Sequence, residues 1–324
     1  MKSAIDVLDA IENIRRAQRD GVYAPHKPLL ILLALARVQH GEPWLVEFTV
    51  IDEQLKQLLA EFGPSSAAKS RHYPFWHLAT DGNGALWELS GPREVLKRPA
   101  GATPSLADLR VHHIKGGFPV DIDDALRHVP DLLQAVASRL LDTYFPLTVH
   151  VDIVASLGLD LDWPREVHEA MPLTTIDGNA QRRRRDPGFR ERVLRAYEYR
   201  CCVCGFDLRI GLTPAGLEAA HIQWHHVGGP DIEPNGLSLC SLHHKLFDLG
   251  AFTVEPSEHR AVFSQHAISG DRGMAGELQF HGRAIHPPQH SDLLPAPEFL
   301  AWNVKNVFKA PARQANAATP RATR

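Results

Sequence analysis

Two short motifs, Cys201-Cys202-Val203-Cys204 and Cys240-Ser241-Leu242-His243, each carry two metal-binding side chains that are separated by two residues. The 35 residues between the motifs are enough for the chain to fold back and gather four ligands around one ion. Thiolate and imidazole ligands suit Zn²⁺ better than Mg²⁺ or Ca²⁺, which prefer oxygen. Because a closed set of four ligands leaves no open position for catalysis, we predict a structural zinc site formed by Cys201, Cys204, Cys240 and His243.

The segment around these motifs predicts a strand and a helix. The apolar residues Leu217, Ala219 and Ala220 indicate a short strand that ends at His221. Leucines recur at helical spacing from residue 241 onward, and a glycine at position 250 ends the predicted helix. This helix places His244 and Asp248 one turn apart on a single face.

Three polar residues, His221, Asn235 and His244, follow one another at separations of 14 and 9 residues. With the flanking segments Glu218-Ala219-Ala220-His221-Ile222 and Asn235-Gly236-Leu237-Ser238-Leu239-Cys240, they resemble the HNH endonucleases of the ββα-metal class, especially McrA-like members with a zinc clip of this kind. The resemblance covers roughly residues 200–252 and implies a metal-dependent DNA endonuclease that hydrolyses phosphodiester bonds.

The resemblance also implies roles for the three residues. His221 is expected to be the general base that takes a proton from water, and His244 the main protein ligand of a catalytic Mg²⁺ or Mn²⁺. Asn235 is expected either to orient the histidine loop or to contribute to the metal shell. Hydrolysis of a phosphodiester needs an activated water and a cation that neutralises developing charge. An imidazole with an ordinary pKa near ~6.5 is sufficiently neutral at pH 7 to act as the base.

One position departs from the wider class, in which an acidic metal ligand often stands immediately before the first histidine. Here that position is Ala220. The remaining candidates for the metal shell are Glu218, Asp248 and water, because Mg²⁺ commonly keeps several waters.

The N-terminal half carries three groups of motifs that share aromatic, basic and Pro/Gly character. They are Pro25-His26-Lys27-Pro28-Leu29-Leu30, Tyr73-Pro74-Phe75-Trp76-His77-Leu78 with Trp87-Glu88-Leu89, and His113-Ile114-Lys115-Gly116-Gly117-Phe118. These segments resemble the sulfur-binding domain of phosphorothioate-dependent, type IV restriction endonucleases. The pairing of such a domain with a C-terminal HNH domain is the organisation of those enzymes, and it implies double-stranded DNA carrying phosphorothioate linkages as the partner.

The resemblance implies a small apolar cup that receives the sulfur atom. Sulfur in place of a phosphate oxygen is larger, more polarisable and poorly hydrated, so an apolar surface accepts it at low desolvation cost. Tyr73 and Pro74 are the expected walls of the cup, and Phe75 and Trp76 are expected core residues. The side chains expected to hold flanking phosphates or reach base edges are basic or imidazole groups: His26, Lys27, Arg71, His72, His77 and Arg98.

Composition supports two domains in a chain of 324 residues, since 44% hydrophobic content is ample for ordinary cores. A net charge of −3 does not indicate nucleic-acid binding, but nine arginines fall between residues 181 and 210, including the run Arg182–Arg185. That run has two interpretations, a solvated linker or a contact with phosphates.

We therefore expect an α+β chain with a mainly helical DNA-recognition domain at residues 1–165 and a linker at 166–186. A zinc-stapled ββα-metal HNH domain should follow at residues 187–309, with a disordered tail at 310–324. Expected elements of the first domain are helices at 5–19, 29–38, 52–62, 123–128 and 131–144, and strands at 75–78 and 85–89 around a turn at 81–84. Apolar segments at 293–307 are expected to form a helix that closes the nuclease domain or a surface for a partner.

Cellular context follows from cysteine usage and hydropathy. Three of the four cysteines are assigned to zinc, which favours a reducing bacterial cytoplasm over a disulfide scaffold. No run approaches 18 uncharged apolar residues, and Asp6 stands where a signal peptide would be apolar, so neither a membrane span nor a leader is expected. Because cutting both strands of a duplex takes two active sites, we expect a homodimer.

Two alternatives stay open from the sequence. The first is an HNH endonuclease that reads another mark, such as 5-methylcytosine, through base edges or a flipped-base pocket. The second is a zinc-stabilised DNA-binding protein without catalysis. The presence of His221, Asn235 and His244 together favours a nuclease over this second alternative.

Overall fold

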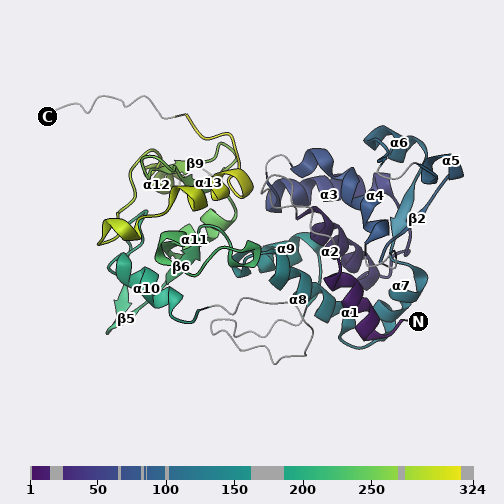
Figure 1. The fold of residues 1–324 in the computed structure, drawn as a ribbon, viewed down its shortest axis with the longest axis horizontal. Coiled ribbons are helices and arrows are strands. Elements are labelled where there is room, and N and C mark those ends of the chain that lie inside the picture. Colours follow the sequence, from purple (N-terminus) through teal and green to yellow (C-terminus); the bar gives the residue numbers. More distant parts are fainter. Residues whose placement is uncertain are drawn as a thin grey trace.

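The computed structural model describes residues 2–14, 25–64, 67–81, 84, 86–98, 102–161, 186–268 and 274–314. Figure 1 shows two groups of elements, a helical group built from the N-terminal half and a mixed group of short strands and helices built from residue 186 onward. The predicted α+β class is confirmed. The predicted linker and the arginine run lie outside the described residues, apart from Asp186.

The N-terminal group is organised around α2 (His26–Gln39), whose residues Pro28 to Ala36 are all buried. A helix that is apolar on every side must be surrounded, because no face of it can meet water at low cost. The helices that surround it include α1 (Ala4–Glu12), α3 (Phe48–Phe62), α7 (Val120–His128), α8 (Leu132–Tyr144) and α9 (His150–Leu157). The helices predicted at 29–38, 52–62, 123–128 and 131–144 are confirmed, with α3 and α7 beginning earlier than expected.

A small antiparallel sheet covers one end of this helical group. Its strands are β1 (Val46–Glu47), β3 (Lys115–Gly117) and β2 (Glu88–Ser90), in that spatial order. Gly117 is needed at the centre of the sheet, because a Cβ there would lie 1.7 Å from the Trp44 carbonyl oxygen. Short helices α5 (Arg93–Leu96) and α6 (Leu106–Val111) and the 3₁₀ turns η1 (Ala67–Ser70), η2 (Leu78–Thr80) and η4 (Leu147–Val149) complete the domain.

Two predicted elements of this domain were wrong. Residues 75–78 form no strand: residues 75–77 belong to α4 (His72–His77) and Leu78 begins η2. Strand β2 pairs with β3 instead of closing a hairpin over the turn at 81–84. Pro74 is tolerated because it lies in the first helical turn, where its missing N–H has no partner to lose. The aromatic residues then pack as a helix face, with the Phe75 ring 5.0 Å from that of Phe48. The helix predicted at 5–19 ends at Glu12, and residues 15–24 lie outside the described part.

The nuclease group is built on a hairpin and one helix. Strand β6 (Leu217–His221) pairs antiparallel with β7 (Gly236–Cys240), so that His221 lies opposite Gly236, and α11 (Ser241–Asp248) follows directly. The predicted strand ending at His221 and the predicted helix beginning at Ser241 are confirmed. Gly250 has φ +72° and closes α11 against the Val307 carbonyl, a position where any Cβ would clash.

The other elements of this group pack around that unit. They are α10 (Phe189–Ala196), the hairpin of β4 (Arg209–Ile210) and β5 (Thr213–Pro214), the hairpin of β8 (Phe252–Val254) and β9 (Ala261–Phe263), α12 (Met274–Leu278), α13 (Pro297–Asn306), and the 3₁₀ turns η5 (His225–Val227), η6 (Glu233–Asn235) and η7 (Ser291–Leu293). Leu300 of α13 is fully buried in the nuclease core, which confirms the predicted closing helix.

The first residues of the predicted disordered tail, 310–313, are ordered beside β9. The Gln265 backbone N–H donates to the Pro311 carbonyl at 2.9 Å, and the Arg313 N–H donates to the Phe263 carbonyl at 2.9 Å. Residues 310–313 therefore add an extended segment beside β9, because this edge offers backbone groups that need partners. Residues 315–324 lie outside the described part of the chain.

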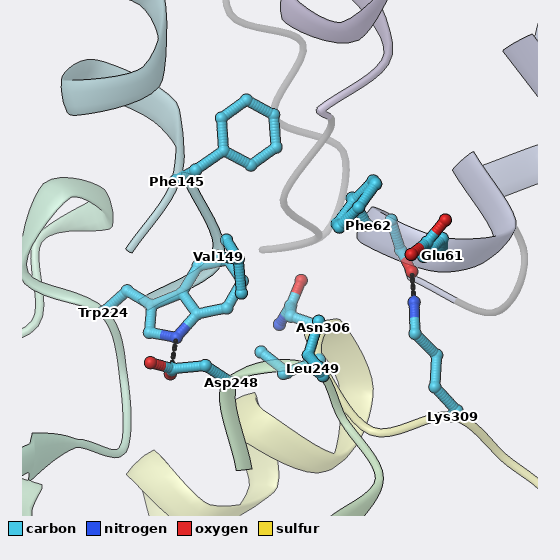
Figure 2. A pocket seen from close by; sticks show the side chains of 11 residues that line it. Glu61, Phe62, Phe145, Val149, Trp224, Asp248, Leu249, Asn306 and Lys309 are labelled. Atoms are coloured by element: carbon cyan, nitrogen blue, oxygen red, sulfur yellow. Dashed lines mark hydrogen bonds between the residues drawn. The ribbon is translucent and has the colours of Figure 1, made fainter. Parts of the chain in front are cut away.

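Lys309 joins the two groups of elements and gives a pH dependence that can be tested. Its ammonium donates to the Gly63 carbonyl, and burial lowers the pKa of Lys309 to about 8, against the opposing effect of Glu61 (Figure 2). Between about pH 8 and the unfolded value near ~10.4, the unfolded chain binds more protons, so the contribution of Lys309 to stability rises with pH.

We therefore expect the free energy of unfolding of Lys309→Met, measured relative to the wild type, to fall by about 1 kcal/mol per pH unit between pH 8 and 10. Denaturant titrations of both proteins at several pH values measure this difference. A difference that stays constant across the range would contradict the assignment.

Candidate functional site

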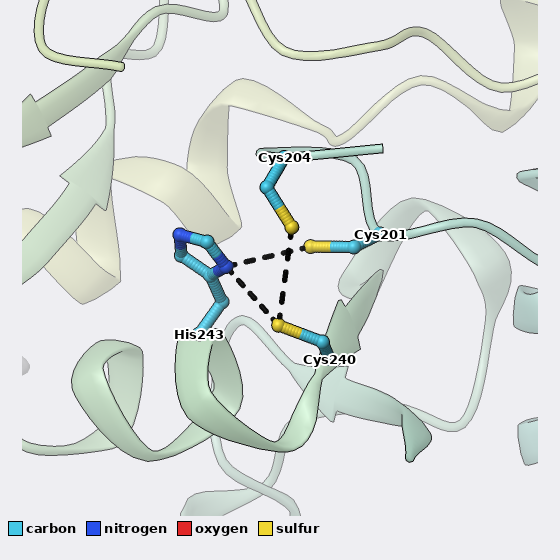
Figure 3. A group of neighbouring side chains, drawn as sticks. All are labelled: Cys201, Cys204, Cys240 and His243. Atoms are coloured by element: carbon cyan, nitrogen blue, oxygen red, sulfur yellow. Dashed lines mark hydrogen bonds between the residues drawn. The ribbon is translucent and has the colours of Figure 1, made fainter. Parts of the chain in front are cut away.

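Four predicted zinc ligands come together in the nuclease group (Figure 3). The Cys204 and Cys240 sulfurs lie 4.0 Å apart, and His243 Nδ1 lies 3.7 Å from the Cys201 sulfur and 3.2 Å from the Cys240 sulfur. A tetrahedral Zn²⁺ with Zn–S bonds of about 2.3 Å separates its ligand atoms by about 3.7 Å. The size and chemistry of the cluster therefore fit a zinc ion.

The surroundings of the cluster separate ligands from non-ligands. His243 turns Nδ1 toward the sulfurs, and its Nε2 lies 2.9 Å from a Glu277 carboxylate oxygen on the other side of the ring. Cys202 is fully buried outside the cluster, where burial raises the pKa of its thiol. It packs as an apolar residue of the nuclease core.

His221 ends β6 and has contacts on its ring face and on one nitrogen. Its ring stacks on Phe189 of α10, with 4.1 Å between centroids and 19° between planes. Its Nε2 lies 2.7 Å from the Asp231 carboxylate. The predicted base is therefore held in one orientation by groups that come from outside its own strand.

Asn235 is fully buried, and its side chain forms hydrogen bonds with the loop that follows His221. Its Oδ1 accepts from the Gln223 N–H at 2.8 Å, and its Nδ2 donates to the carbonyls of Gln223 and Pro230 at 3.0 and 2.9 Å. These bonds tie the two ends of residues 223–235 together. Of the two roles left open by the sequence, the arrangement supports loop orientation.

His244 lies on α11 between two carboxylates. Its Nδ1 is 2.6 Å from Glu218, and its Nε2 is 3.3 Å from Asp248. Burial opposes the charged imidazole, but Asp248 and Glu218 outweigh burial and raise the pKa of His244 to about 9. Ala220, which directly precedes His221 in the sequence, is fully buried in the core and offers no ligand atom to a metal ion. One imidazole with carboxylate oxygens beside it is a donor set that fits Mg²⁺ or Mn²⁺.

Asp248 connects this histidine to the N-terminal group. Its carboxylate accepts from Trp224 Nε1 at 3.0 Å (Figure 2). It also accepts from the hydroxyl of Thr148 in η4, the turn before α9. Lys245, one turn before Asp248, donates to the Thr148 carbonyl and to Asp152. The recognition and nuclease groups therefore meet at the helix that carries His244.

Helix α4 carries four of the eight predicted sulfur- and DNA-binding residues, His72, Tyr73, Pro74 and His77. Tyr73 is 49% exposed, its ring stacks on His77 at 6.0 Å, and it lies 4.4 Å from the His72 ring. Pro74 is buried. Burial lowers the pKa of both His72 and His77, so the two imidazoles favour the neutral form. The exposed part of α4 is accordingly aromatic and uncharged.

The predicted cations of this domain are each paired with a carboxylate. Lys27 lies 2.5 Å from the buried Asp81, and Arg98 lies 3.0 Å from Asp108. Arg71 forms a bidentate pair with Asp52, at 2.5 and 3.3 Å.

His26 turns its Nε2 toward the Ala67 carbonyl, 2.9 Å away, and burial lowers its pKa. The structure brings His72, Tyr73, Pro74 and His77 together on α4, and places His26 inward on α2.

Two residues were missed from the sequence. Arg110, which is half exposed, shares the Asp52 carboxylate with Arg71, so this group keeps a net positive charge. Asp231 contacts His221 across a loop. The only available signal for Asp231 was a carboxylate between the two motif residues His221 and Asn235, and nothing in the spacing names its partner.

Comparisons with known proteins match both parts of the chain. A family model described as ScoMcrA-like, DNA sulfur-binding domain matches residues 4–162, and a family model described as HNH endonuclease matches residues 201–255. A search of curated proteins found no match.

Among solved structures, the chain is similar to the sulfur-binding domain of ScoMcrA complexed with phosphorothioated DNA, with 23% identity over 46% of this chain and 93% of that one and a TM-score of 0.40. The sulfur-binding domain of SprMcrA in complex with phosphorothioated DNA matches at 22% identity over 49% and 95%, with a TM-score of 0.38. The type IV phosphorothioation-dependent restriction endonuclease ScoMcrA matches at 22% identity over 47% of this chain and 27% of its own length, with a TM-score of 0.38. Within the described residues, no helix is both long and apolar enough to span a bilayer.

Proposed function

This chain joins a ScoMcrA-like DNA sulfur-binding domain to an HNH endonuclease domain, and we propose that it is a modification-dependent restriction endonuclease that binds phosphorothioated DNA and cuts it nearby. The observation that carries the proposal is the presence of both domains on one chain, with His221, Asn235 and His244 placed on the hairpin, loop and helix of the nuclease part.

We propose that cleavage uses two metal sites with separate purposes. Cys201, Cys204, Cys240 and His243 would hold a structural zinc that fixes α11 to the end of β7. His244, with Glu218 beside its Nδ1, would hold a catalytic Mg²⁺ or Mn²⁺. That ion, when bound, supplies positive charge for the scissile phosphate and the leaving oxygen.

The side chains of the site then have distinct tasks. His221 accepts a proton from the attacking water, while Asn235 keeps the loop after β6 closed so that the His221 ring stays in place. Asp248 orients His244 from the side opposite Glu218, because Trp224 and Thr148 hold its carboxylate.

We propose that Tyr73, Pro74 and His77 form the cup that accepts sulfur. An uncharged aromatic surface costs a poorly hydrated sulfur little to approach, whereas a phosphate oxygen would lose strong hydration there. We propose that four other side chains of this domain contact phosphates and base edges: Lys27, Arg71, His72 and Arg98. His26 supports the cup from within the domain. We further infer a homodimer, because two active sites are needed to cut both strands. We also infer that the protein acts in the bacterial cytoplasm.

Tyr73→Ala tests the cup. The wild-type full chain is expected to prefer a duplex with one internal phosphorothioate over an unmodified duplex of the same sequence by roughly tenfold or more, about 1.4 kcal/mol. Tyr73→Ala should reduce that preference below about threefold, because the sulfur loses its apolar contact. The affinity for unmodified DNA should change little. Fluorescence anisotropy with several sequence contexts measures both affinities.

Arg139→Ala is the matched control. Arg139 lies on α8 and pairs at the surface with Glu12 of α1. An undiminished preference in Tyr73→Ala would remove Tyr73 from the cup. Equal binding of both duplexes by the wild type would overturn the sulfur-reading proposal, and the same assay with 5-methylcytosine duplexes would then test the other mark.

A further inference from the structure

Asp231 lies in the loop between β6 and β7 and contacts the proposed base directly. One oxygen of its carboxylate is 2.7 Å from His221 Nε2, and the side chain of Asp231 is only 12% exposed. The three residues predicted from their spacing, His221, Asn235 and His244, do not account for this contact. We propose that Asp231 is a positioning residue that fixes the ring orientation and tautomer of His221, an inference that rests on the proposed nuclease function.

The Asp231 carboxylate is itself held in place from a second direction. Its other oxygen accepts from the Asp186 backbone N–H at 2.7 Å, and the Asp231 carbonyl accepts from Arg192 Nη2 at 2.8 Å. Arg192 also pairs with Asp186 and Glu233, at 2.7 and 2.9 Å. The start of the nuclease group therefore braces the loop that carries Asp231.

The charge state of Asp231 follows from the same contacts. Burial alone would raise the pKa of Asp231, but bonds from the Asp186 N–H and the His221 ring outweigh burial and lower it. His225 also faces this carboxylate, with 3.7 Å between Nε2 and the nearer oxygen. An ionised carboxylate can only accept hydrogen bonds, so it selects the form of His221 that carries hydrogen on Nε2.

That selection leaves the proton-accepting lone pair of His221 at Nδ1. In the hydrolytic step, a water O–H bond breaks and its proton moves to Nδ1, the water oxygen bonds to phosphorus, and the bond from phosphorus to the leaving sugar oxygen breaks. The leaving oxygen takes a proton from solvent water. Asp231 stays ionised throughout and stabilises the imidazolium that forms, and the Phe189 stack prevents the ring from tilting.

The experiment compares Asp231→Ala, Asp231→Asn and Glu258→Gln in the full chain. We expect single-turnover cleavage of phosphorothioated duplex to slow about 100-fold in Asp231→Ala and about tenfold in Asp231→Asn, whose amide oxygen still accepts from Nε2–H but carries no charge. The affinity for the duplex and the zinc content should stay within twofold of the wild type. Glu258→Gln is the control: it removes an exposed carboxylate of the same domain that pairs with Arg260, and it should cleave within threefold of the wild type.

A second measurement does not depend on cleavage. Nitrogen-15 NMR of the His221 ring should show hydrogen on Nε2 in the wild type and a mixture of both tautomers in Asp231→Ala. Cleavage by Asp231→Ala within threefold of the wild type, or an unchanged tautomer, would overturn the role of Asp231. A wild-type protein that cuts no duplex while its His221 tautomer depends on Asp231 would instead overturn the nuclease proposal and leave the contact standing.

Discussion

Cys201→Ser is expected to release zinc and unfold the nuclease part of the chain. The four ligands tie the segment after α10 to the end of β7 and to α11, three pieces that share only a small core. Structural zinc sites in small domains contribute about 10–16 kcal/mol of apparent binding free energy, far more than one small core provides. Cleavage should therefore fall to background, and metal analysis should show less than one zinc per chain.

The N-terminal half should survive this change. Its buried residues form one cluster from Val7 to Leu161, separate from the cluster that runs from Phe189 to Leu300. The Cys201→Ser protein should thus still bind phosphorothioated duplex, and limited proteolysis should leave a fragment close to the predicted 1–165 domain.

Cys202→Ala is the matched control for the zinc prediction. Cys202 is equally buried and adjacent in sequence, but its sulfur lies outside the metal-binding cluster. Its loss should cost stability through a small cavity while one zinc per chain is retained. Full zinc content and normal cleavage in Cys201→Ser would contradict the structural zinc.

Parts of the fold that depend on local spacing could be predicted from the sequence. The metal cluster follows from two CxxC-type spacings, and α2 and α11 follow from apolar periodicity and the glycine at position 250. The strand to His221 follows from a short apolar run. In each of these cases, residues close in sequence carry the whole signal.

Features that depend on contacts between distant residues could not be predicted. Residues 75–78 have aromatic character typical of a strand, but packing against Phe48 makes them part of a helix. Four of the contacts join residues 10 to 100 positions apart along the chain: Asp52 with Arg71 and Arg110, Asp231 with His221, and Asp248 with Thr148. Spacing along the sequence contains no information on such pairs. The residues that support the site can therefore be identified only from the three-dimensional structure.

The pairing of basic residues bears on how DNA would be read. Lys27, Arg71 and Arg98 are each neutralised by a carboxylate, and the chain as a whole carries a net charge of −3. Non-specific DNA binding grows with the number of phosphates that unpaired cations neutralise. Such a surface disfavours unmodified DNA, so discrimination by an apolar cup on α4 would not be overwhelmed by charge. Because Arg71 and Arg110 share the single Asp52 carboxylate, one net positive charge remains at Arg110 for the DNA backbone.

His221→Ala is expected to abolish cleavage without weakening DNA binding. Removing a general base costs about 10²–10⁴ in rate, and His244 is not a replacement base, because it is the proposed ligand of the catalytic metal and lies between Glu218 and Asp248. Single-turnover cleavage and anisotropy on the same phosphorothioated duplex separate the two effects, and His290→Ala, an exposed histidine of the same domain, is the control. Combining His221→Ala with Asp231→Ala should add no further loss, because a positioning residue has nothing left to position. Unchanged cleavage in His221→Ala would instead leave a DNA-binding protein whose histidines serve the fold alone.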